Sequence, residues 1–384
     1  MRVFIAAAAV AVGLGVSGSA VAVDRAATPA GTVELNNQGV EMAAQARYAE
    51  AEEFYRRALA KLAEGAEPPG SPMPGAGRNA ESELTLTQAL SRLQAATGES
   101  ASDAGHVLDN LAALYLAKGD IANAESSALR AGAMLGETGR SGNRVLLATI
   151  YVEERRFAEA RTLLESALPG ASAQLGFTLN ASLAAAALGE EKLDDAQEFC
   201  RRALEIASTA LPPNHPGIAS VWNNLGQVYR FQGRYLEAET SYRKAIEIWT
   251  AARGPAHPLV ARGLLNLAAF EHERGRDRAA EELYGRAAGI LDRTIGTDAL
   301  QTMIARNELG EVLRAEGRYV ASEQLSGATL PAIRKLLPES DPRVLRALTN
   351  YARLLAATKR QADANALWTH IRLVAGTLPS GSFQ

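Results

Sequence analysis

The sequence predicts an all-α protein, built as a right-handed α-solenoid of about eight stacked helical hairpins. Three observations predict this fold. A set of residues recurs at a fixed period, apolar residues inside each unit follow helical spacing, and the composition favours helices over sheets. Much of the 47% apolar content is alanine, and only 5% of the residues are aromatic. Alanine-rich, aromatic-poor chains suit closely packed helices.

The repeat is clearest between residues 215 and 294. Leu225 is followed by Leu267 after 42 residues (267 − 225), and the same step leads on to Leu309 and Tyr351. Other residues keep this register: Pro216, Pro258 and Pro342; Arg234, Arg276, Arg318 and Arg360; Ala238, Ala280 and Ala364. Because the register runs through four units without a gap, it indicates an internal repeat rather than chance.

Each unit has the pattern of two amphipathic helices joined by a short turn. In the clearest unit one apolar stripe has the spacing i, i+3, i+4 and i+7, and a second has i, i+4 and i+7. Gly233-Arg234 separates the two stripes and marks the turn. The stripe residues are Trp222, Leu225, Gly226 and Tyr229, then Ala238, Tyr242 and Ala245. Such a hairpin cannot bury its stripes alone, so neighbouring hairpins are expected to stack.

The order Trp222-x-x-Leu225-Gly226-x-x-Tyr229, followed by Ala238 and Tyr242, resembles the signature of the tetratricopeptide repeat. The usual period of that repeat is about 34 residues. The longer period here, with His-Pro before the first helix and Asn-Asn-Leu within it, resembles the repeats of kinesin light chain. The resemblance implies a helix–turn–helix array that binds other proteins and catalyses nothing.

Fainter copies of the unit lie on both sides of the clearest one, so about eight hairpins are expected. The predicted organisation is a first hairpin at 32–64, a Pro/Gly-rich linker with one helix at 65–103, a solenoid at 104–374 and a flexible tail at 375–384. In the seventh unit Ser322, Ser326 and Thr329 replace the usual alanine, aromatic residue and alanine, which leaves the packing of that unit open.

The first 22 residues have the pattern of a secretory signal peptide. Arg2 precedes an apolar run, and Ala20-Val21-Ala22 provides a small-residue cleavage site. We therefore expect an exported protein of bacterial type, periplasmic or secreted. The alternative is an uncleaved N-terminal membrane anchor, although Val3–Val23 is barely long enough to span a bilayer core of about 30 Å.

Composition and motifs argue against most other chemistries. The net charge is −3 with acids and bases interspersed, so no nucleic-acid partner is expected. The G-x-G-x-x-G match at 13–18 lies inside the predicted signal peptide and opens no βαβ unit. The chain has a single cysteine, Cys200, in the position that Tyr242 and Tyr284 hold in later units, and this predicts a buried apolar role.

Metal and cofactor sites are not expected either. His215 and His257 are equivalent in the repeat, but one repeat step separates residues by about 10 Å, whereas zinc ligands lie about 2 Å from the ion. Each precedes a proline at the first turn of a predicted helix, which indicates a structural role. We therefore predict no enzyme activity, cofactor, metal or small-molecule substrate.

The face of the first helices opposite their apolar stripe is predicted to line a concave groove. The candidate groove residues are Asn223, Asn224, Gln227, Phe231, Arg262, Asn266, Arg346, Asn350 and Arg353. The resemblance to kinesin light chain implies that Asn224, Asn266 and Asn350 hydrogen-bond a peptide main chain, while Glu308 interrupts their row. Phe231 could take an apolar side chain and the arginines acidic ones. The alternative is a solvated polar face without a ligand.

The leading hypothesis is a scaffold that captures a peptide or protein segment in this groove. A second hypothesis is a structural or self-associating envelope protein. It is suggested by the apolar end of the last predicted helix, with Leu367, Trp368, Ile371, Leu373 and Val374. A third is an enzyme that uses the atypical region 65–103. Contact with a membrane is expected only if the N-terminal segment stays uncleaved.

Overall fold

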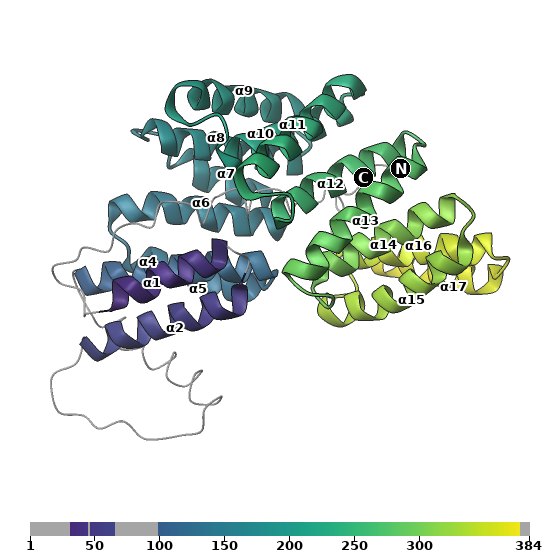
Figure 1. The fold of residues 1–384 in the computed structure, drawn as a ribbon, viewed down its shortest axis with the longest axis horizontal. Coiled ribbons are helices and arrows are strands. Elements are labelled where there is room, and N and C mark those ends of the chain that lie inside the picture. The colour runs from purple at the N-terminus through teal and green to yellow at the C-terminus, as the bar shows by residue number, and fades with distance from the viewer. Residues whose placement is uncertain (1–30, 45–46, 66–98, 377–384) are drawn as a thin grey trace, which may run out of the picture. The chain divides into compact units, whose positions relative to one another are not determined.

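The computed structural model describes residues 31–44, 47–65 and 99–376, and within these ranges the chain forms helices and no strands (Figure 1). Sixteen helices follow one another in eight pairs. The first members, called A helices, are α1 (Thr32–Ala44), α4 (Glu99–Lys118), α6 (Glu137–Glu153), α8 (Ala173–Gly189), α10 (Pro216–Phe231), α12 (Pro258–Glu273), α14 (Leu300–Ala315) and α16 (Pro342–Ala357). The second members, called B helices, are α2 (Tyr48–Gly65), α5 (Ile121–Met134), α7 (Phe157–Glu165), α9 (Leu193–Ala210), α11 (Tyr235–Arg253), α13 (Asp277–Thr294), α15 (Tyr319–Leu336) and α17 (Gln361–Gly376).

The predicted all-α repeat fold is confirmed, and the helix starts show its period. The last four A helices begin at residues 216, 258, 300 and 342, a constant step of 42 (258 − 216), and the last four B helices keep the same step. Earlier B helices α5, α7 and α9 start 36 residues apart (157 − 121). The predicted signal peptide, most of the predicted linker region 65–103 and the end of the predicted tail lie outside the described residues.

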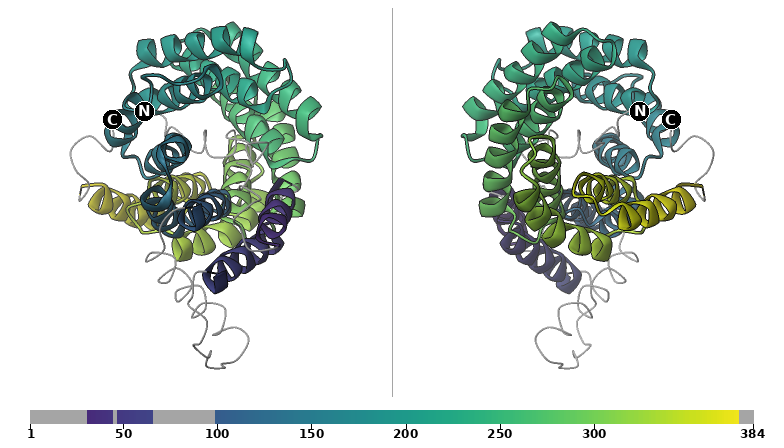
Figure 2. Two further views of the ribbon diagram at one scale, coloured as in Figure 1. Left: turned by 90° about the vertical axis from the view of Figure 1, so that its left-hand side faces the viewer. Right: turned by 90° about the vertical axis from the view of Figure 1, so that its right-hand side faces the viewer.

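The chain divides into two compact units, and each is described by itself. The described residues of one unit run up to Val228 and those of the other begin at Tyr229, so the boundary lies within α10. Inside each unit a B helix packs against the A helix that follows it, for example α2 against α4 and α13 against α14. Figure 2 shows these helical pairs from two further directions.

In the unit that ends at Val228, a core of leucines and alanines joins the first hairpin to the next. Leu35 of α1 and Tyr55 of α2 belong to the same buried cluster as Leu108 and Leu111 of α4. In the other unit Tyr242 of α11 packs with Leu267 and Phe270 of α12. The stripe residues predicted from helical spacing therefore form the interfaces between neighbouring helices.

The starts of the A helices explain why prolines recur at the repeat period. His257 Nδ1 accepts a hydrogen bond from the Leu259 backbone N–H at 3.2 Å, and Asp341 Oδ1 accepts one from Arg343 at 2.8 Å. Each of these residues precedes a proline, whose missing N–H is not needed in the first turn. His215 caps the Gly217 N–H in the same way, at 3.2 Å. The structural role predicted for both histidines is confirmed.

In the seven pairs from α4 to α17, the turn from the A helix to its B helix contains one residue in the left-handed region. Gly233, Gly275 and Gly317 hold this place with φ of 76°, 71° and 77°. In the last pair Lys359 holds it with φ of 64°, and Glu191 does so in an earlier one with φ of 60°. Side chains with a Cβ pay about 1–2 kcal/mol for this conformation, which glycine adopts freely.

The arginine next to that turn has the same neighbours in several repeats. Arg318 Nη1 lies 2.6 Å from Glu281 Oε1, and Arg360 Nη1 lies 2.7 Å from Glu323 Oε1, each on the preceding B helix. Arg156 Nη1 reaches Glu125 at 2.8 Å in the other unit. The arginine register seen in the sequence is thus the register of an ion pair between successive B helices.

The atypical seventh pair packs without its alanines and aromatic residue. Ser322, Ser326 and Thr329 are all buried in α15. Ser322 Oγ donates to the Gly310 carbonyl at 2.7 Å, and Thr329 Oγ1 donates to the Leu325 carbonyl at 2.9 Å. Because these hydroxyls donate to backbone carbonyls, the hydrogen bonds offset most of the cost of burying them.

Among the helices of the described ranges, none combines the length and the apolar character needed to cross a bilayer.

Candidate peptide-binding surface

The predicted groove residues lie on the A helices but differ in their surroundings. Asn223, Asn224 and Gln227 are buried on α10, as is Asn350 on α16. The remaining five, Phe231, Arg262, Asn266, Arg346 and Arg353, are half-buried. A simple picture of uniformly exposed polar side chains therefore does not describe this face.

On α16 the predicted residues bond to side chains of the preceding A helix, α14. Asn350 Nδ2 donates to Asn307 Oδ1 at 2.9 Å, so one amide joins two neighbouring A helices. Arg346 forms a two-point ion pair with Glu308, with Nε donating to Oε1 at 2.6 Å. The glutamate that interrupts the asparagine row is thus the partner of a predicted groove arginine.

A second set of charged side chains joins the same two helices, α14 and α16. Glu311, which is buried, accepts from Arg353 Nη1 at 3.0 Å and from Arg314 Nε at 2.7 Å. Glu308, by direct interaction, raises the pKa of Arg346 above its ordinary value, so this guanidinium stays charged. Two of the three arginines expected to receive acidic ligand groups, Arg346 and Arg353, already face carboxylates of the preceding A helix.

The same asparagine bond occurs at the other end of the chain. Asn110 Nδ2 of α4 donates to Asn36 Oδ1 of α1 at 2.9 Å. We call this bond, from an asparagine amide on one A helix to an asparagine on the A helix before it, the asparagine tie. Because both N–H and carbonyl groups of an amide can bond, asparagine suits a contact between two helices as well as one with a ligand.

On α8 and α10 the corresponding polar groups are left unmatched. Asn224 Oδ1, Gln227 Nε2 and Ser182 Oγ have no hydrogen-bond partner among the described residues. Their residues are only 1%, 4% and 2% exposed. A buried polar group without a partner costs about 1–3 kcal/mol. Asn307 Nδ2 on α14 is in the same condition, although its Oδ1 accepts from Asn350.

The helices α8 and α10 approach each other at their first turns. The Phe177 ring of α8 meets the His215 ring edge-on, with centroids 6.0 Å apart. A Cβ added at Gly217 of α10 would lie only 2.7 Å from Phe177 Cε1, which shows how close the two helices come. Ser182 and Asn224 lie further along these two neighbouring helices.

The other predicted residues have separate surroundings. The Arg262 guanidinium lies over the buried Trp249 ring, 4.8 Å from its centroid, so its stacking partner is the preceding B helix. Phe231 lies under Arg230 at 5.2 Å, and Arg230 Nη2 also bonds Glu273 Oε1 at 2.6 Å. These contacts hold the aromatic and basic side chains in place.

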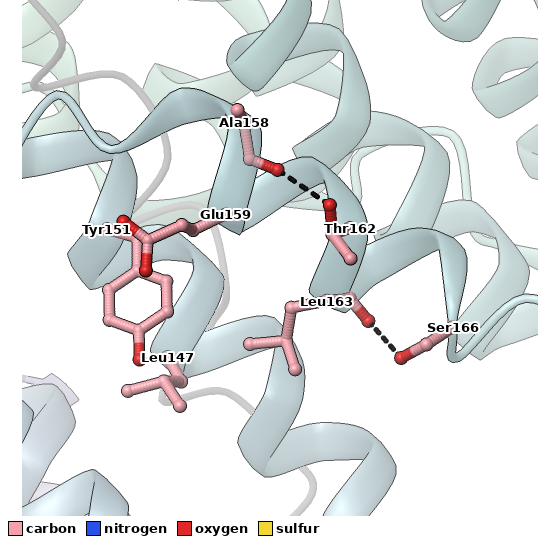
Figure 3. A pocket seen from close by; sticks show the side chains of 7 residues that line it. All are labelled: Leu147, Tyr151, Ala158, Glu159, Thr162, Leu163 and Ser166. Atoms are coloured by element: carbon pink, nitrogen blue, oxygen red, sulfur yellow. Dashed lines mark hydrogen bonds between the residues drawn. The ribbon is translucent and has the colours of Figure 1, made fainter.

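One surface feature was not predicted. A shallow hollow of about 460 Å³ lies on α6 and α7, with Leu147, Tyr151 and Leu163 as its apolar lining (Figure 3). The hydroxyls at its edge are occupied, because Thr162 donates to the Ala158 carbonyl at 2.9 Å and Ser166 to the Leu163 carbonyl at 2.6 Å (Figure 3). Apart from the Glu159 carboxylate and the Tyr151 hydroxyl, the lining of the hollow is therefore mainly apolar.

A sequence signal for this hollow exists. Helix α7 has nine residues, whereas the next shortest B helix, α5, has 14. Pro169-Gly170 follows soon after α7 and prevents its extension. A B helix that stops early leaves part of its neighbours uncovered, so the proline is the residue that could have indicated the hollow.

The motifs set aside in the sequence have structural roles here. Cys200 is fully buried, its Sγ lies 3.9 Å from the Val221 carbonyl oxygen, and burial raises the pKa of its thiol. The buried role predicted for it is confirmed. Within the described ranges no group of three or more His, Cys, Asp or Glu side chains is placed to hold a metal ion.

Comparison with known families identifies the repeat. The family model described as tetratricopeptide repeat matches residues 174–249 and again residues 217–293. These matches extend from α8 to α13. The chain therefore contains tetratricopeptide repeats, as the sequence resemblance implied. No protein of curated function matches the sequence closely enough to indicate a relative.

Solved structures share the fold at low identity. The chain resembles the Rap conjugation gene regulator of the plasmid pLS20 in complex with the Phr* peptide, at 13% identity and a TM-score of 0.55, over 92% of this chain and 99% of that one. Weaker matches are a kinesin light chain repeat protein of Podosopora anserina (20% identity, 51% and 92% of the two chains, TM-score 0.42) and BtubC from P. vanneervenii (19%, 62% and 91%, 0.44). At these identities the likeness concerns the fold alone.

Proposed function

We propose that this protein is a non-catalytic scaffold that binds an extended peptide segment of a partner protein along its A helices, centred on α8 and α10. The observation that carries the proposal is the unmatched pair on α10. Asn224 Oδ1 is an acceptor and Gln227 Nε2 a donor, three residues apart on one helix and both without a partner among the described residues.

A peptide main chain complements this pair. Each of its residues offers one N–H donor and one carbonyl acceptor, whatever its side chain. An N–H could donate to Asn224 Oδ1, and a carbonyl could accept from Gln227 Nε2. Both atoms are covered in the described structure, so the side chains over them have to turn aside to admit a main chain. The ligand would then recover the cost of leaving the two groups unmatched.

The likeness to known folds supports a peptide rather than a small molecule as ligand. The Rap regulator that this chain resembles is described in complex with a peptide. The sequence resemblance to kinesin light chain also implies main-chain recognition by groove asparagines. Both supports concern the class of ligand and leave its sequence open.

The charged residues on α14 and α16 are already paired with one another and are not the first contact with the ligand in this proposal. Arg346 and Arg353 would have to exchange Glu308 and Glu311 for an acidic ligand, which costs an existing ion pair. We therefore assign the first contact with the ligand to α8 and α10. Acidic side chains at α14 and α16 remain a prediction of the sequence.

The test begins with a ligand selected on the full chain. A random 12-residue peptide library displayed on phage supplies a peptide, and calorimetry measures its affinity. Asn224→Ala with Gln227→Ala should weaken binding at least tenfold while the helical circular dichroism stays unchanged. Equal affinity of this variant and the parent would remove the proposed site.

A matched control uses amides elsewhere on the surface. Gln361 Nε2 donates to Asn365 Oδ1 at 3.0 Å on the exposed side of α17, far along the sequence from α10. Gln361→Ala with Asn365→Ala removes two amides in the same way and should leave the affinity unchanged. A loss in this control would mean that amide removal in general weakens the peptide contact.

Self-association is the second candidate, and one observation favours it. Leu373 near the end of α17 is 70% exposed, and Trp368 on the same helix is only half-buried. An exposed apolar end of this kind suits stacking with another chain. Light scattering over a hundredfold range of concentration would show a rising mass, whereas a constant monomer mass would dismiss this candidate.

We also propose that the protein works outside the cytoplasm, on the strength of residues 1–22. Fractionation of cells with mass spectrometry of the mature N-terminus tests this. A chain that starts at Val23 in the envelope or medium is the expected result, and an intact Met1 in a membrane fraction would favour the anchored form.

A further inference from the structure

Two B helices begin with an exposed pair of apolar and aromatic side chains. Leu236 at the start of α11 is 78% exposed and Val320 at the start of α15 is 75% exposed. Tyr235 and Tyr319 precede them and are also exposed. Among the described residues only seven large apolar or aromatic side chains are exposed, and these are four of them. They are therefore concentrated at two equivalent places rather than scattered singly over the surface.

The two pairs have the same position in the repeat. Leu236 and Val320 are 84 residues apart (320 − 236), which is two repeats of 42. The repeat between them has Asp277-Arg278 at this position, at the start of α13. Arg278 is exposed and has no hydrogen bond or ion pair with the described residues. The order along the three helix starts is thus apolar, charged, apolar.

Ion pairs between successive B helices place the three starts side by side. Arg276, just before α13, has its Nη1 3.3 Å from Glu239 Oε2 of α11. Arg318, just before α15, has its Nη1 2.6 Å from Glu281 Oε1 of α13. Since neighbouring hairpins are about one helix diameter apart, ~10 Å, the two apolar pairs are separated by about 20 Å. All three helices belong to one compact unit, so these starts form a single row.

One end of this row is held in place before any contact is made. The Arg274 guanidinium lies 4.1 Å from the centroid of the Tyr235 ring, and the Phe270 ring lies 6.2 Å from the same centroid. A side chain that is already fixed loses little conformational entropy on association. The apolar surface beside Leu236 is therefore preformed.

We infer that this row, Tyr235-Leu236, Asp277-Arg278 and Tyr319-Val320, is an interface between two copies of the chain. A two-fold axis through the start of α13 reverses the row, and the row has the same order in both directions. The axis places Leu236 of one copy on Val320 of the second copy, and Val320 on the second copy's Leu236. A symmetric dimer needs a self-complementary surface of this kind.

The charges at the centre of the row also complement each other. The two-fold axis places Arg278 of one copy beside Asp277 of the second copy, twice over. Asp277 Oδ1 lies 2.6 Å from His272 Nδ1, and Oδ2 of the same carboxylate can accept from the guanidinium of the other copy. Stable interfaces cover about 800 Å² on each partner, and this row offers less, so the dimer is weak and depends on concentration.

Paired cysteines test the position of the two-fold axis. The native Cys200 is fully buried and does not interfere. A mixture of Leu236→Cys protein and Val320→Cys protein should form a disulfide-linked dimer under mild oxidation. Leu236→Cys protein alone should not, because its two cysteines lie about 20 Å apart and a disulfide needs Cα atoms within about 7 Å. No cross-link in the mixture, or an equal one in Leu236→Cys alone, would overturn the inference.

Sedimentation velocity over a hundredfold range of concentration measures the dimer itself. The parent should pass from monomer to dimer as the concentration rises. Leu236→Ser with Val320→Ser should raise the dissociation constant of the dimer at least tenfold, with unchanged helical circular dichroism. Arg278→Glu should weaken the dimer as well, because it places a second carboxylate against Asp277 of the other copy.

The matched control removes an exposed leucine elsewhere in the same unit. Leu373 on α17 is 70% exposed, and Leu373→Ser should leave the dissociation constant unchanged. Loss of the dimer in Leu373→Ser but not in Leu236→Ser with Val320→Ser would assign association to the end of α17 and overturn the inference. A parent that stays monomeric at every concentration would overturn it too. Neither result bears on the peptide site of α10, which the calorimetry tests separately.

Discussion

Asn143 on α6 donates through Nδ2 to Asp109 Oδ1 on α4 at 2.7 Å, and the same nitrogen donates to the Ala128 carbonyl at 2.9 Å. Asp109 stands in the repeat position that Asn36 and Asn307 hold in their own units. The residue 37 places after Asp109, one 36-residue repeat plus one, is Leu146, which offers no amide. A carboxylate therefore replaces the amide acceptor and bonds an asparagine one turn earlier.

This carboxylate should make stability depend on pH. Burial raises the pKa of Asp109 to about 6, against the opposing effect of the Asn143 hydrogen bond. A folded-state pKa above the unfolded value of about 3.9 means that the folded protein binds the proton more tightly. The contribution of Asp109 is fully present below about pH 4 and is lost as the pH rises through about 6.

The measurement compares the wild type with Asp109→Asn, whose amide cannot ionise. The difference in their free energies of unfolding, obtained from urea titrations, should shift against the wild type by about 2 kcal/mol between pH 4 and pH 7. His106 on the same helix, whose pKa is lowered by burial, is present in both proteins, so its contribution cancels. A difference that does not change with pH would contradict this account.

The turn residue Lys359 offers a gain in stability. Its φ of 64° places it in the left-handed region, where equivalent repeats carry glycine. Lys359→Gly should raise the free energy of unfolding by about 0.5–1 kcal/mol, since relief of strain exceeds the added entropy of the unfolded chain. Lys359→Ala keeps the Cβ and should give no such gain. Urea unfolding of both variants decides the point, and equal stabilities would argue against strain at this turn.

Gly39 in the first hairpin should not tolerate a methyl group. A Cβ there would lie 2.5 Å from Cε1 of the buried Tyr55 ring, so α1 and α2 would have to separate. Gly39→Ala is expected to cost about 1–3 kcal/mol through overpacking. Gly327→Ala on α15 meets no atom within 4 Å and should be neutral or slightly stabilising. Thermal unfolding measures the stability of both variants, and equal changes in Tm would contradict the prediction.

The helical repeat could be predicted from the sequence because its signals are local or strictly periodic. Pro216, Pro258 and Pro342 begin helices where the register places them. Glycine recurs at the turn because the backbone there is left-handed. Arginine recurs beside it because it forms an ion pair with the preceding B helix. Each of these features depends on residues within one hairpin or exactly one repeat apart.

The details of the binding face could not be predicted in this way. The asparagine row suggested equal roles for Asn224 and Asn350, yet only Asn350 meets an asparagine on the helix before it. Asn350 bonds the residue 43 places before it (350 − 307), one repeat plus one residue. This offset comes from how neighbouring A helices lie side by side, which a single-helix wheel does not show. The hollow on α6 and α7 likewise follows from where α7 ends, rather than from any motif.

The ion pair between α14 and α16 gives the last prediction. Glu308 is buried and Arg346 half-buried, and they pair at two points between the helices. Glu308→Ala leaves a guanidinium without its carboxylate, and Arg346→Ala leaves a buried carboxylate without its cation. Each single variant should lose about 1–2 kcal/mol of unfolding free energy, a value reduced from that of a fully buried pair because Arg346 reaches solvent.

The double variant separates the interaction between the two charges from the cost of leaving one of them without its partner. Removing both charges leaves neither group unmatched, so Glu308→Ala with Arg346→Ala should lose less than the sum of the two single variants. A double-mutant cycle by urea unfolding at two salt concentrations measures this coupling. The coupling should persist at 1 M salt, where an exposed pair would be screened. Simple additivity would mean that the two side chains lie together without stabilising the contact between α14 and α16.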